Sequence, residues 1–259
     1  MGEAIAITSG KGGVGKSSTV VNVATMLAKF GYKVCMIDMD LGLKNLDSML
    51  GLENRVIFDL KDVMEGRCTL QRAMIQDKRE HQLYLIPACK TVRIDHFSQQ
   101  HLQEIVNSLK KSFDFVFLDT PAGIEKGFLD SIHCVSKTIV VTTLDITALQ
   151  DADRIIGILM KEGMESISFI INRLQPRLIE KGSCVSIEDA KSWLSIDLLG
   201  YVFEDEAMID SNNKGIPVTY RVENQLYECY KCIAKRLLHE PCPLPKYKYK
   251  TFFYKLFNA

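Results

Sequence analysis

The sequence predicts an α/β protein with a doubly wound, mostly parallel sheet and helices on both faces. Short apolar runs alternate along the chain with stretches of helical periodicity, a pattern typical of parallel strands linked by helices. Several of these runs are apolar throughout, as expected for strands that are covered on both faces. A glycine-rich loop follows the first run, and folds of this class bind ligands at the carboxyl ends of their strands.

The expected strands are the apolar runs at residues 4–8, 33–37, 83–86, 114–118, 138–143, 167–171 and 198–202. The clearest helical periodicity lies at residues 18–30, 98–111, 146–162 and 222–239. Three prolines within residues 241–245 should end the last helix and form an extended connector. We therefore divide the chain into a domain at 1–240, a proline-rich connector at 241–248 and an amphipathic helix at 249–259.

The composition is that of a well-packed protein without a strong charge. Of the 259 residues, 47% are hydrophobic, which excludes disorder as the general state. Lysine plus arginine and aspartate plus glutamate number 32 each, so no overall field favours nucleic acid, and a sequence-specific nucleic-acid partner is not expected. The first strand begins by residue 4, and no apolar run approaches the roughly 18 residues that span a bilayer. We expect a cytoplasmic protein without a signal peptide, with reduced cysteines.

The glycine-rich loop at residues 10–17 reads Gly-Lys-Gly-Gly-Val-Gly-Lys-Ser and fits the phosphate-loop pattern G-x-x-x-x-G-K-[ST]. Its glycines let successive N–H groups converge on phosphate oxygens at the positive end of the following helix. Lys16 is expected to reach the β- and γ-phosphates, and the Ser17 hydroxyl to ligate Mg²⁺. The expected loop contacts to the nucleotide are Gly10, Lys11, Gly12, Gly13, Val14, Gly15, Lys16, Ser17 and Ser18.

Carboxylates follow two of the predicted strands. Asp38 and Asp40 come after the second strand, where a carboxylate could orient an attacking water or hold a water of the Mg²⁺ shell. Asp119 ends a strongly apolar strand, where a charge is costly unless it faces a cation, so an outer-sphere Mg²⁺ role is expected. The alternative is that these aspartates only cap loops or helices. Beside a phosphate loop, we favour the functional interpretation.

Together these motifs resemble the MinD family of septum-site-determining ATPases, within the wider MinD/ParA class of P-loop NTPases. Lys11 matches the signature lysine of the deviant Walker A motif. Residues 38–47 are similar to the switch I segment, and residues 119–125 to the Walker B and switch II segment. Residues 151–157 and 204–207 also resemble this family, so the likeness runs from residue 2 to about residue 238.

The resemblance implies a slow, partner-stimulated ATPase whose two subunits enclose two ATP molecules. Lys11 would reach the other subunit's phosphates, and Asp40 would position the water. Asn172 matches the family's adenine-reading asparagine, although Asn172-Arg173 could instead be only a turn. The implied catalytic set is Lys11, Lys16 and Asp40, and the implied metal set is Ser17, Asp40 and Asp119.

Three departures from the family pattern affect details of partner and base contacts. Ser17-Ser18 stands where Thr-Thr is usual, Thr143-Leu-Asp145 replaces Asn-Pro-Glu, and Phe203 occupies a usual proline position. The metal-binding hydroxyl is retained in the first of these.

The last residues are expected to form an interfacial helix. From residue 246 onward the chain has four lysines and no acidic residue, although the whole chain is neutral. In a helix the aromatic and leucine side chains would enter the acyl boundary while lysines reach anionic headgroups. The alternative is a helix docked on its own domain. The expected membrane-contacting residues are Tyr249, Lys250, Phe252, Phe253, Lys255, Leu256 and Phe257.

The resemblance also implies partners and leaves other roles open. A MinD-like protein would recruit a MinC-like division inhibitor to the inner face of the membrane in its ATP state, under a MinE-like activator or a DivIVA-type anchor. One alternative is a FlhG-type flagellar-number regulator, which the early first strand disfavours. A second is an Mrp-like iron–sulfur carrier, suggested by Cys229 and Cys232, although their helical spacing favours packing.

Overall fold

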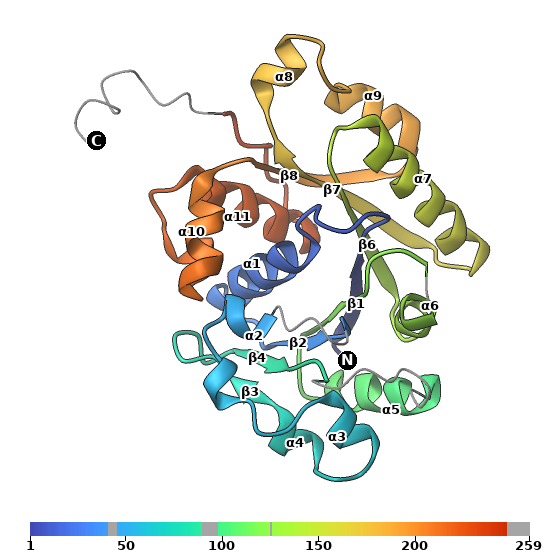
Figure 1. The fold of residues 1–259 in the computed structure, drawn as a ribbon, viewed down its shortest axis with the longest axis vertical. Helices are drawn as coiled ribbons and strands as arrows, with labels where there is room; N and C mark the ends of the chain where they lie inside the picture. The colour runs from blue at the N-terminus through green and yellow to red at the C-terminus, as the bar shows by residue number, and fades with distance from the viewer. Residues whose placement is uncertain (41–45, 90–97, 125, 248–259) are drawn as a thin grey trace.

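An eight-stranded sheet forms the centre of the computed structural model, which describes residues 1–40, 46–89, 98–124 and 126–247 (Figure 1). The strand order is β3-β4-β2-β5-β1-β6-β7-β8, and every neighbouring pair is parallel except β3 and β4. This confirms the doubly wound, mostly parallel sheet. The strands are β1 (Glu3–Thr8), β2 (Val34–Asp38), β3 (Ile75–Gln76), β4 (Leu83–Ile86), β5 (Phe115–Asp119), β6 (Lys137–Thr142), β7 (Ser166–Leu174) and β8 (Asp197–Phe203).

Helices cover both faces of the sheet. Figure 1 shows α1, α10 and α11 on one face and α5, α6 and α7 on the other. The helical segments are α1 (Lys16–Lys29), α2 (Leu46–Met49), η1 (Glu53–Arg55), α3 (Leu60–Met64), α4 (Leu70–Ala73), α5 (Gln99–Leu109), α6 (Lys126–Ile132), α7 (Ile146–Lys161), α8 (Pro176–Glu180), α9 (Ile187–Leu194), α10 (Glu206–Lys214), η3 (Val218–Tyr220) and α11 (Gln225–Leu237).

Burial explains why the apolar runs become strands. All five residues of β2 and all five of β5 are buried, because helices pack on both sides of these central strands. Helix α5 instead buries only one stripe, formed by Leu102, Ile105, Val106 and Leu109 at helical spacing. All seven predicted strands and all four predicted helices are confirmed, with ends that move by a few residues. The two-residue strand β3 and the short helices were not predicted.

The proline-rich connector is extended as predicted, but it is docked on the domain. Residues 241–247 contain neither helix nor strand. The Tyr201 hydroxyl donates a hydrogen bond of 2.7 Å to the Pro245 carbonyl, and the Tyr247 ring packs edge-on against Phe203 with centroids 5.0 Å apart. These contacts hold the connector against β8. Lys248 and the predicted amphipathic helix at 249–259 lie outside the described residues, so that helix and the domain boundaries stay predictions.

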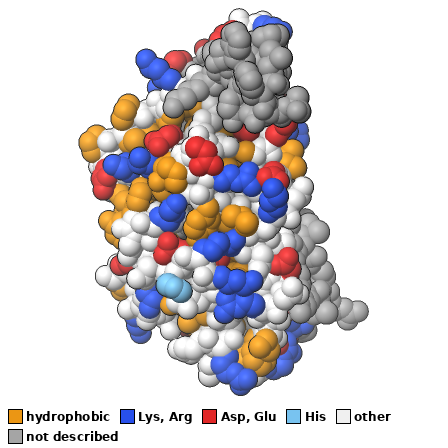
Figure 2. Space-filling view, turned by 90° about the vertical axis from the view of Figure 1, so that its left-hand side faces the viewer, with side chains coloured by type: hydrophobic (Ala, Val, Ile, Leu, Met, Phe, Trp, Pro, Cys, Tyr) orange, Lys and Arg blue, Asp and Glu red, His pale blue; other side chains and the backbone are white. Residues whose placement is uncertain are grey.

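The surface agrees with the neutral composition. On the face that carries α10, side chains of Lys and Arg are interspersed with Asp and Glu and with hydrophobic groups (Figure 2). None of the helices that the structure describes has the length and apolar character needed to traverse a bilayer.

Candidate functional site

The glycine-rich loop joins β1 to α1 at the carboxyl edge of the sheet. Gly13 and Gly15 have φ values of 81° and 89°, a left-handed conformation that glycine adopts without a steric penalty. Helix α1 begins at Lys16, and no side chain caps its first turn among the described residues. Its first backbone N–H groups are therefore available to an anion, and the phosphate contact expected from the sequence stays a prediction.

Asn172 supports the loop from β7. Its amide Nδ2 donates a hydrogen bond of 2.8 Å to the Val14 carbonyl, and its side chain is buried. A Cβ on Gly15 would lie only 2.1 Å from this Nδ2, so the close approach requires glycine there. Asn172 lies within the strand, and the alternative that it forms only a turn is wrong. Its neighbour Arg173 does have a left-handed φ of 55°. Asn172 thus lies beside the loop, and its contact with the adenine base stays a prediction.

Lys16 and Asp119 form a buried ion pair beneath the loop. Lys16 Nζ lies 2.5 Å from Asp119 Oδ1, and the two side chains are 7% and 0% exposed. The second carboxylate oxygen, Oδ2, is buried and has no hydrogen-bond donor among the described residues. In the structure the Lys16 ammonium faces the Asp119 carboxylate, and the Mg²⁺ role expected for Asp119 stays a prediction. The lysine expected to reach phosphates therefore contacts the strand carboxylate in this state.

Asp38 and Asp40 bring two more carboxyl groups to the same place. Asp38 is the last residue of β2, is almost fully buried and accepts hydrogen bonds from the backbone N–H groups of Asp40 (3.0 Å) and Leu46 (3.4 Å). Burial, followed by the nearby Asp119 carboxylate, raises the pKa of Asp38 to about 8. Burial also raises the pKa of the half-buried Asp40, while Lys16 opposes that rise.

Asp38 and Asp40 were both predicted to follow the second strand, but only Asp40 was assigned to the expected site. The available signal was that Asp38 continues a fully apolar strand without a break. A carboxyl group at such a position must be buried or must meet a cation. The structure therefore assembles Lys16, Asp38, Asp40 and Asp119 in one cluster, of which three members were predicted.

The two serines that follow Lys16 face different surroundings. Ser17 is half-buried at the start of α1. Ser18 is buried, and its hydroxyl accepts a hydrogen bond of 3.1 Å from the Asn212 amide of α10. The Ser18 hydroxyl therefore bonds to α10. The predicted nucleotide contact of Ser18 would come from its backbone N–H.

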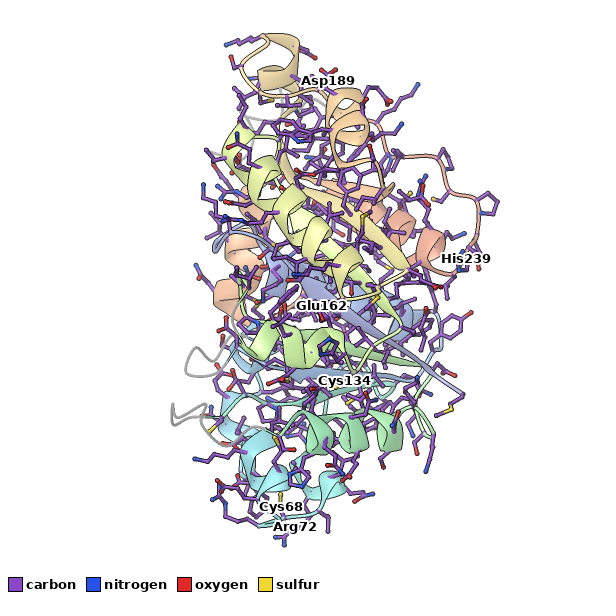
Figure 3. The ribbon with its side chains drawn as sticks, turned by 90° about the vertical axis from the view of Figure 1, so that its right-hand side faces the viewer. Cys68, Arg72, Cys134, Glu162, Asp189 and His239 are labelled. Carbon is purple, nitrogen blue, oxygen red and sulfur yellow. The ribbon has the colours of Figure 1, made fainter. Side chains whose placement is uncertain are left out.

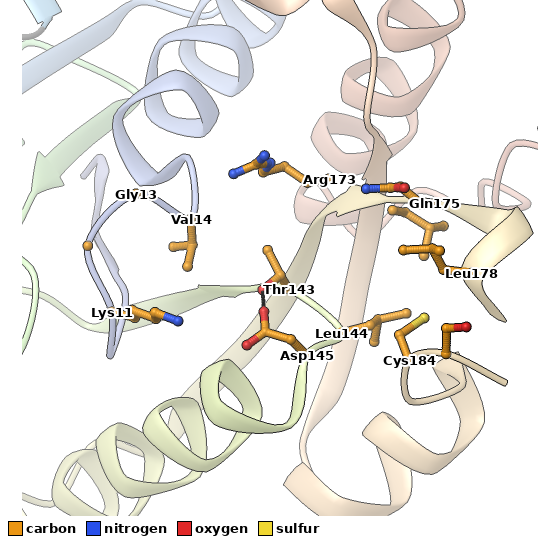
Figure 4. A pocket seen from close by; sticks show the side chains of 13 residues that line it. Lys11, Gly13, Val14, Thr143, Leu144, Asp145, Arg173, Gln175, Leu178 and Cys184 are labelled. Carbon is orange, nitrogen blue, oxygen red and sulfur yellow. Dashed lines mark hydrogen bonds between the residues drawn. The ribbon is translucent and has the colours of Figure 1, made fainter.

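Lys11 lies at an exposed position beside a pocket of about 370 Å³ (Figure 4). Its Nζ is 3.4 Å from the Thr147 hydroxyl, a long contact. The nearby Thr143 hydroxyl donates a hydrogen bond to the Asp145 carboxylate, so the substituted residues of this loop pair with each other. The pocket is lined by Lys11, Gly12, Gly13, Val14, Thr143, Leu144, Asp145, Arg173, Leu174, Gln175, Leu178, Ser183 and Cys184.

These features fit a phosphorylated ligand with a divalent cation. The uncapped start of α1 offers N–H donors, and the pocket beside the loop can receive the rest of a nucleotide. Lys16 pairs with Asp119, the carboxyl groups of Asp38 and Asp40 lie near enough for the charges of this pair to affect their pKa values, and Asp119 Oδ2 has no donor among the described residues. Oxygen-rich, partly unneutralised groups of this kind suit Mg²⁺.

Comparison with known proteins shows the family. Residues 5–218 match the family model of the CobQ/CobB/MinD/ParA nucleotide binding domain. The septum site-determining protein MinD of Bacillus subtilis is 46% identical over 246 residues, which cover 94% of this chain and 92% of the relative. The chain belongs to the MinD family.

Solved structures of MinD proteins have the same architecture. The MinC:MinD cell division protein complex of Aquifex aeolicus aligns with a TM-score of 0.89 and 37% identity, over 95% of this chain and 99% of that chain. MinD of Pyrococcus horikoshii, solved with Mg-ADP, aligns with a TM-score of 0.81 and 29% identity, over 92% of this chain and 96% of that chain. The MinD relatives favour the septum-site interpretation over the flagellar and iron–sulfur alternatives.

The two cysteines that suggested the iron–sulfur alternative are buried in the core. Cys229 and Cys232 lie on α11 and are 0% and 2% exposed. Burial raises the pKa of Cys229 to about 12, which disfavours the thiolate that a metal cluster requires. The packing interpretation of their spacing is confirmed.

Proposed function

We propose that this MinD-family protein is an ATP-dependent, dimerising ATPase that positions the cell-division site by recruiting a division inhibitor to the membrane. The observation that carries the proposal is the cluster of Lys16, Asp38, Asp40 and Asp119 beneath a phosphate loop, in a chain 46% identical to a MinD. The same geometry would serve any Mg²⁺-nucleotide, and the relatives give it its cellular role.

The cluster supports a simple binding mechanism. On ATP binding, the Lys16 ammonium would leave Asp119 for the phosphate oxygens, which carry more negative charge. Asp119 would then hold a water of the Mg²⁺ shell, and the Ser17 hydroxyl would ligate the ion directly. When bound, Mg²⁺ neutralises charge that develops on the phosphates. Asn172 would keep the loop in shape and present its amide to the adenine base.

Turnover would require groups outside the buried cluster. The half-buried Asp40 lies close enough to Lys16 and Asp119 for their charges to affect its pKa. We infer that it orients the attacking water. Lys11 is exposed beside the pocket, and its long contact with Thr147 leaves it able to move. We infer that it crosses to the phosphates of a second subunit and stabilises charge there, as an arginine finger does. Turnover would be slow without a partner.

The membrane part of the proposal comes from the sequence of residues 249–259. One short interfacial helix should bind weakly and reversibly. Two copies on an ATP-bound dimer would gain avidity on the order of 10²–10⁴ without new contacts. The protein would thus stay on anionic lipid at the inner face of the membrane with ATP and return to the cytoplasm after hydrolysis. A MinC-like inhibitor would bind the dimer, since the Aquifex aeolicus relative is solved with MinC, and a MinE-like activator or a DivIVA-type anchor would set its location.

Sedimentation with liposomes tests the proposal. The full chain is mixed with vesicles of anionic lipid and with ADP, ATP or a non-hydrolysable ATP analogue. We expect little protein in the ADP pellet, more with ATP and most with the analogue, since only the last prevents return to the monomer. Vesicles of neutral lipid are the control. Equal sedimentation with all three nucleotides would contradict a nucleotide-controlled switch.

A further inference from the structure

The chain reverses direction after α11 and brings two distant cysteines together. Helix α11 ends at Leu237, and His239 has a left-handed φ of 60° that turns the backbone into the connector (Figure 3). The connector then runs back past the last turns of α11. As a result Cys242 lies against Cys232, although ten positions separate them in the sequence.

Both thiols lie beside the same carbonyl oxygen. The Cys232 thiol is 3.5 Å and the Cys242 thiol 3.8 Å from the Pro243 carbonyl oxygen, and the Cys232 thiol is also 3.6 Å from the Cys242 carbonyl oxygen. Cys232 is 2% exposed, whereas Cys242 is only half-buried. One thiol is therefore open to solvent and the other is protected behind it.

The backbone around Cys242 is held in place by a charged group. Arg236 donates hydrogen bonds from Nη1 to the Cys242 carbonyl (3.3 Å) and from Nη2 to the Leu198 carbonyl of β8 (2.9 Å). The guanidinium thus holds the Cys242 backbone against the sheet, next to the last turn of α11.

We propose that Cys232 and Cys242 form a reversible disulfide that locks the connector onto α11 when the protein meets a peroxide. In the first step the Cys242 thiolate attacks one peroxide oxygen, the O–O bond breaks, and Cys242 becomes a sulfenic acid while the other oxygen leaves as water or alcohol. The Cys232 thiol then attacks the Cys242 sulfur, the S–S bond forms, and water leaves. The two thiols are oxidised by two electrons and the peroxide is reduced by two.

The burial of the two thiols explains their order of reaction. Burial first, then the neighbouring Cys242 side chain, raises the pKa of Cys232 to about 12, so Cys232 is a poor first nucleophile. It is well placed to resolve a sulfenic acid that forms beside it. The bond would close a short loop through the His239 turn and fix the point from which residues 248–259 leave the domain. This regulation goes beyond the nucleotide switch proposed above.

Peptide mapping of the full chain tests the proposal. The protein is treated with hydrogen peroxide, remaining thiols are alkylated, and trypsin is added without reductant. Cys232 and Cys242 then fall on different peptides, 232–235 and 237–246, and Cys229 falls on a third, 222–231. We expect peptides 232–235 and 237–246 to be joined with the loss of two hydrogens, and to separate after dithiothreitol.

Variants distinguish the proposed pair from general oxidation. Cys242→Ser should abolish the link and leave residue 232 reduced, whereas Cys232→Ser should leave Cys242 as a sulfenic acid that dimedone traps. Cys68→Ser is the matched control, because Cys68 lies beside α3 and α4, far from His239 (Figure 3), and the link should be unchanged in it. Over-oxidation of Cys242 in the wild type without a link, or a link to peptide 222–231, would overturn the proposal.

Limited proteolysis of the folded protein reports the structural consequence. Lys246 lies between the docked residues Pro245 and Tyr247, and its side chain is exposed. Oxidised wild type should be cut there several-fold more slowly than the reduced protein, while Cys232→Ser should be cut equally fast in both conditions. A disulfide that leaves the cleavage rate unchanged would contradict the locking role.

Discussion

Asp38 and Asp119 are paired residues of the neighbouring parallel strands β2 and β5, and both are buried at the carboxyl edge of the sheet. Lys16 Nζ lies 2.5 Å from Asp119 Oδ1, and Asp38 forms no ion pair among the described residues. Burial, followed by the nearby Asp119 carboxylate, raises the pKa of Asp38 to about 8. A bound cation would neutralise the carboxylate charge that Lys16 does not balance.

The raised pKa makes stability depend on pH in a definite direction. In the unfolded chain Asp38 should lose its proton near the ordinary aspartate pKa of about 4, whereas the folded protein keeps that proton up to about 8. Between these values the folded state binds more protons, so the free energy of unfolding falls as pH rises, by up to about 1.4 kcal/mol per pH unit. We expect this fall in the free energy of unfolding to be absent in Asp38→Asn, which has no carboxyl group to titrate.

Urea denaturation between pH 5 and pH 8, with EDTA and no nucleotide, measures the effect. The stability of Asp38→Asn relative to the wild type should increase steadily across this range. Asp153→Asn, on the exposed side of α7, is the matched control for the loss of one carboxylate. A difference between Asp38→Asn and the wild type that stays constant with pH would contradict the raised pKa.

Lys16 is expected to serve both folding and nucleotide binding. Lys16→Met removes the ammonium that pairs with Asp119 and should cost about 3–5 kcal/mol of stability, since it leaves a buried charge unpaired. It should also abolish ATP binding, because it removes the ammonium that is expected to bind the β- and γ-phosphates. Titration calorimetry with Mg²⁺-ATP and urea denaturation measure the two effects.

A double variant separates these roles. Adding Asp119→Asn to Lys16→Met removes the stranded charge and should restore much of the lost stability, but not ATP binding. If ATP affinity returned together with stability, the effect of Lys16 on binding would be indirect.

Asn172 should contribute to affinity through the loop and to specificity through the base. Asn172→Ala leaves the buried Val14 carbonyl without its donor, which should weaken ATP binding by about 1–3 kcal/mol. The preference for ATP over GTP should fall as well, which distinguishes a contact with the base from a purely structural role. Asn107→Ala, at an exposed asparagine of α5 that does not line the pocket, is the control. Weaker binding with an unchanged preference for ATP would refute the adenine contact.

Lys11 and Asp40 should affect different steps. Asp40→Ala should still form dimers with ATP but turn over far more slowly, because the group that orients water is lost. Lys11→Ala should fail to form the dimer, since Lys11 is proposed to bind phosphates across the interface. Light scattering with ATP and phosphate release measure these steps. A Lys11→Ala dimer as stable as the wild type would refute the role in trans.

Local patterns predicted the central strands, the long helices and the phosphate loop, because these depend on neighbouring residues. The sequence did not predict that Lys16 binds Asp119, 103 residues away, since this contact exists only after β1 and β5 pair. It also placed Asp38 outside the strand, because its burial depends on β5. Two-residue β3 has no periodicity to detect, and β4 supplies its pairing.

The connector illustrates the same limit at the end of the chain. Its prolines correctly predicted an extended segment. Its attachment depends on Tyr201 and Phe203 of β8 and on Arg236 of α11, which reach it only in the folded domain. Sequence patterns thus identified the conformation of residues 241–247 but not the surface that holds them.

The docked connector sharpens the test of the proposed membrane segment. Because Tyr247 packs on Phe203, a truncation should begin at Lys248 so that the domain keeps this contact. We expect deletion of 248–259 to preserve ATP binding and dimerisation and to abolish sedimentation with anionic liposomes. Phe253→Glu with Leu256→Glu should do the same, since each large apolar side chain contributes at most about 1.5–3 kcal/mol when buried.

A second pair of glutamates separates the apolar face from simple charge repulsion. On a helix, Thr251 and Asn258 lie on the side opposite Phe253, so Thr251→Glu with Asn258→Glu adds the same charge away from the expected acyl boundary. This control should weaken binding only through the screened surface potential, in which each lysine contributes about 1 kcal/mol, and salt should reduce its effect. Equal loss in both pairs would show that charge alone drives recruitment. Continued sedimentation of the truncated protein with ATP would mean that residues 248–259 are not the membrane anchor, and a helix packed on the domain would then explain their apolar face better.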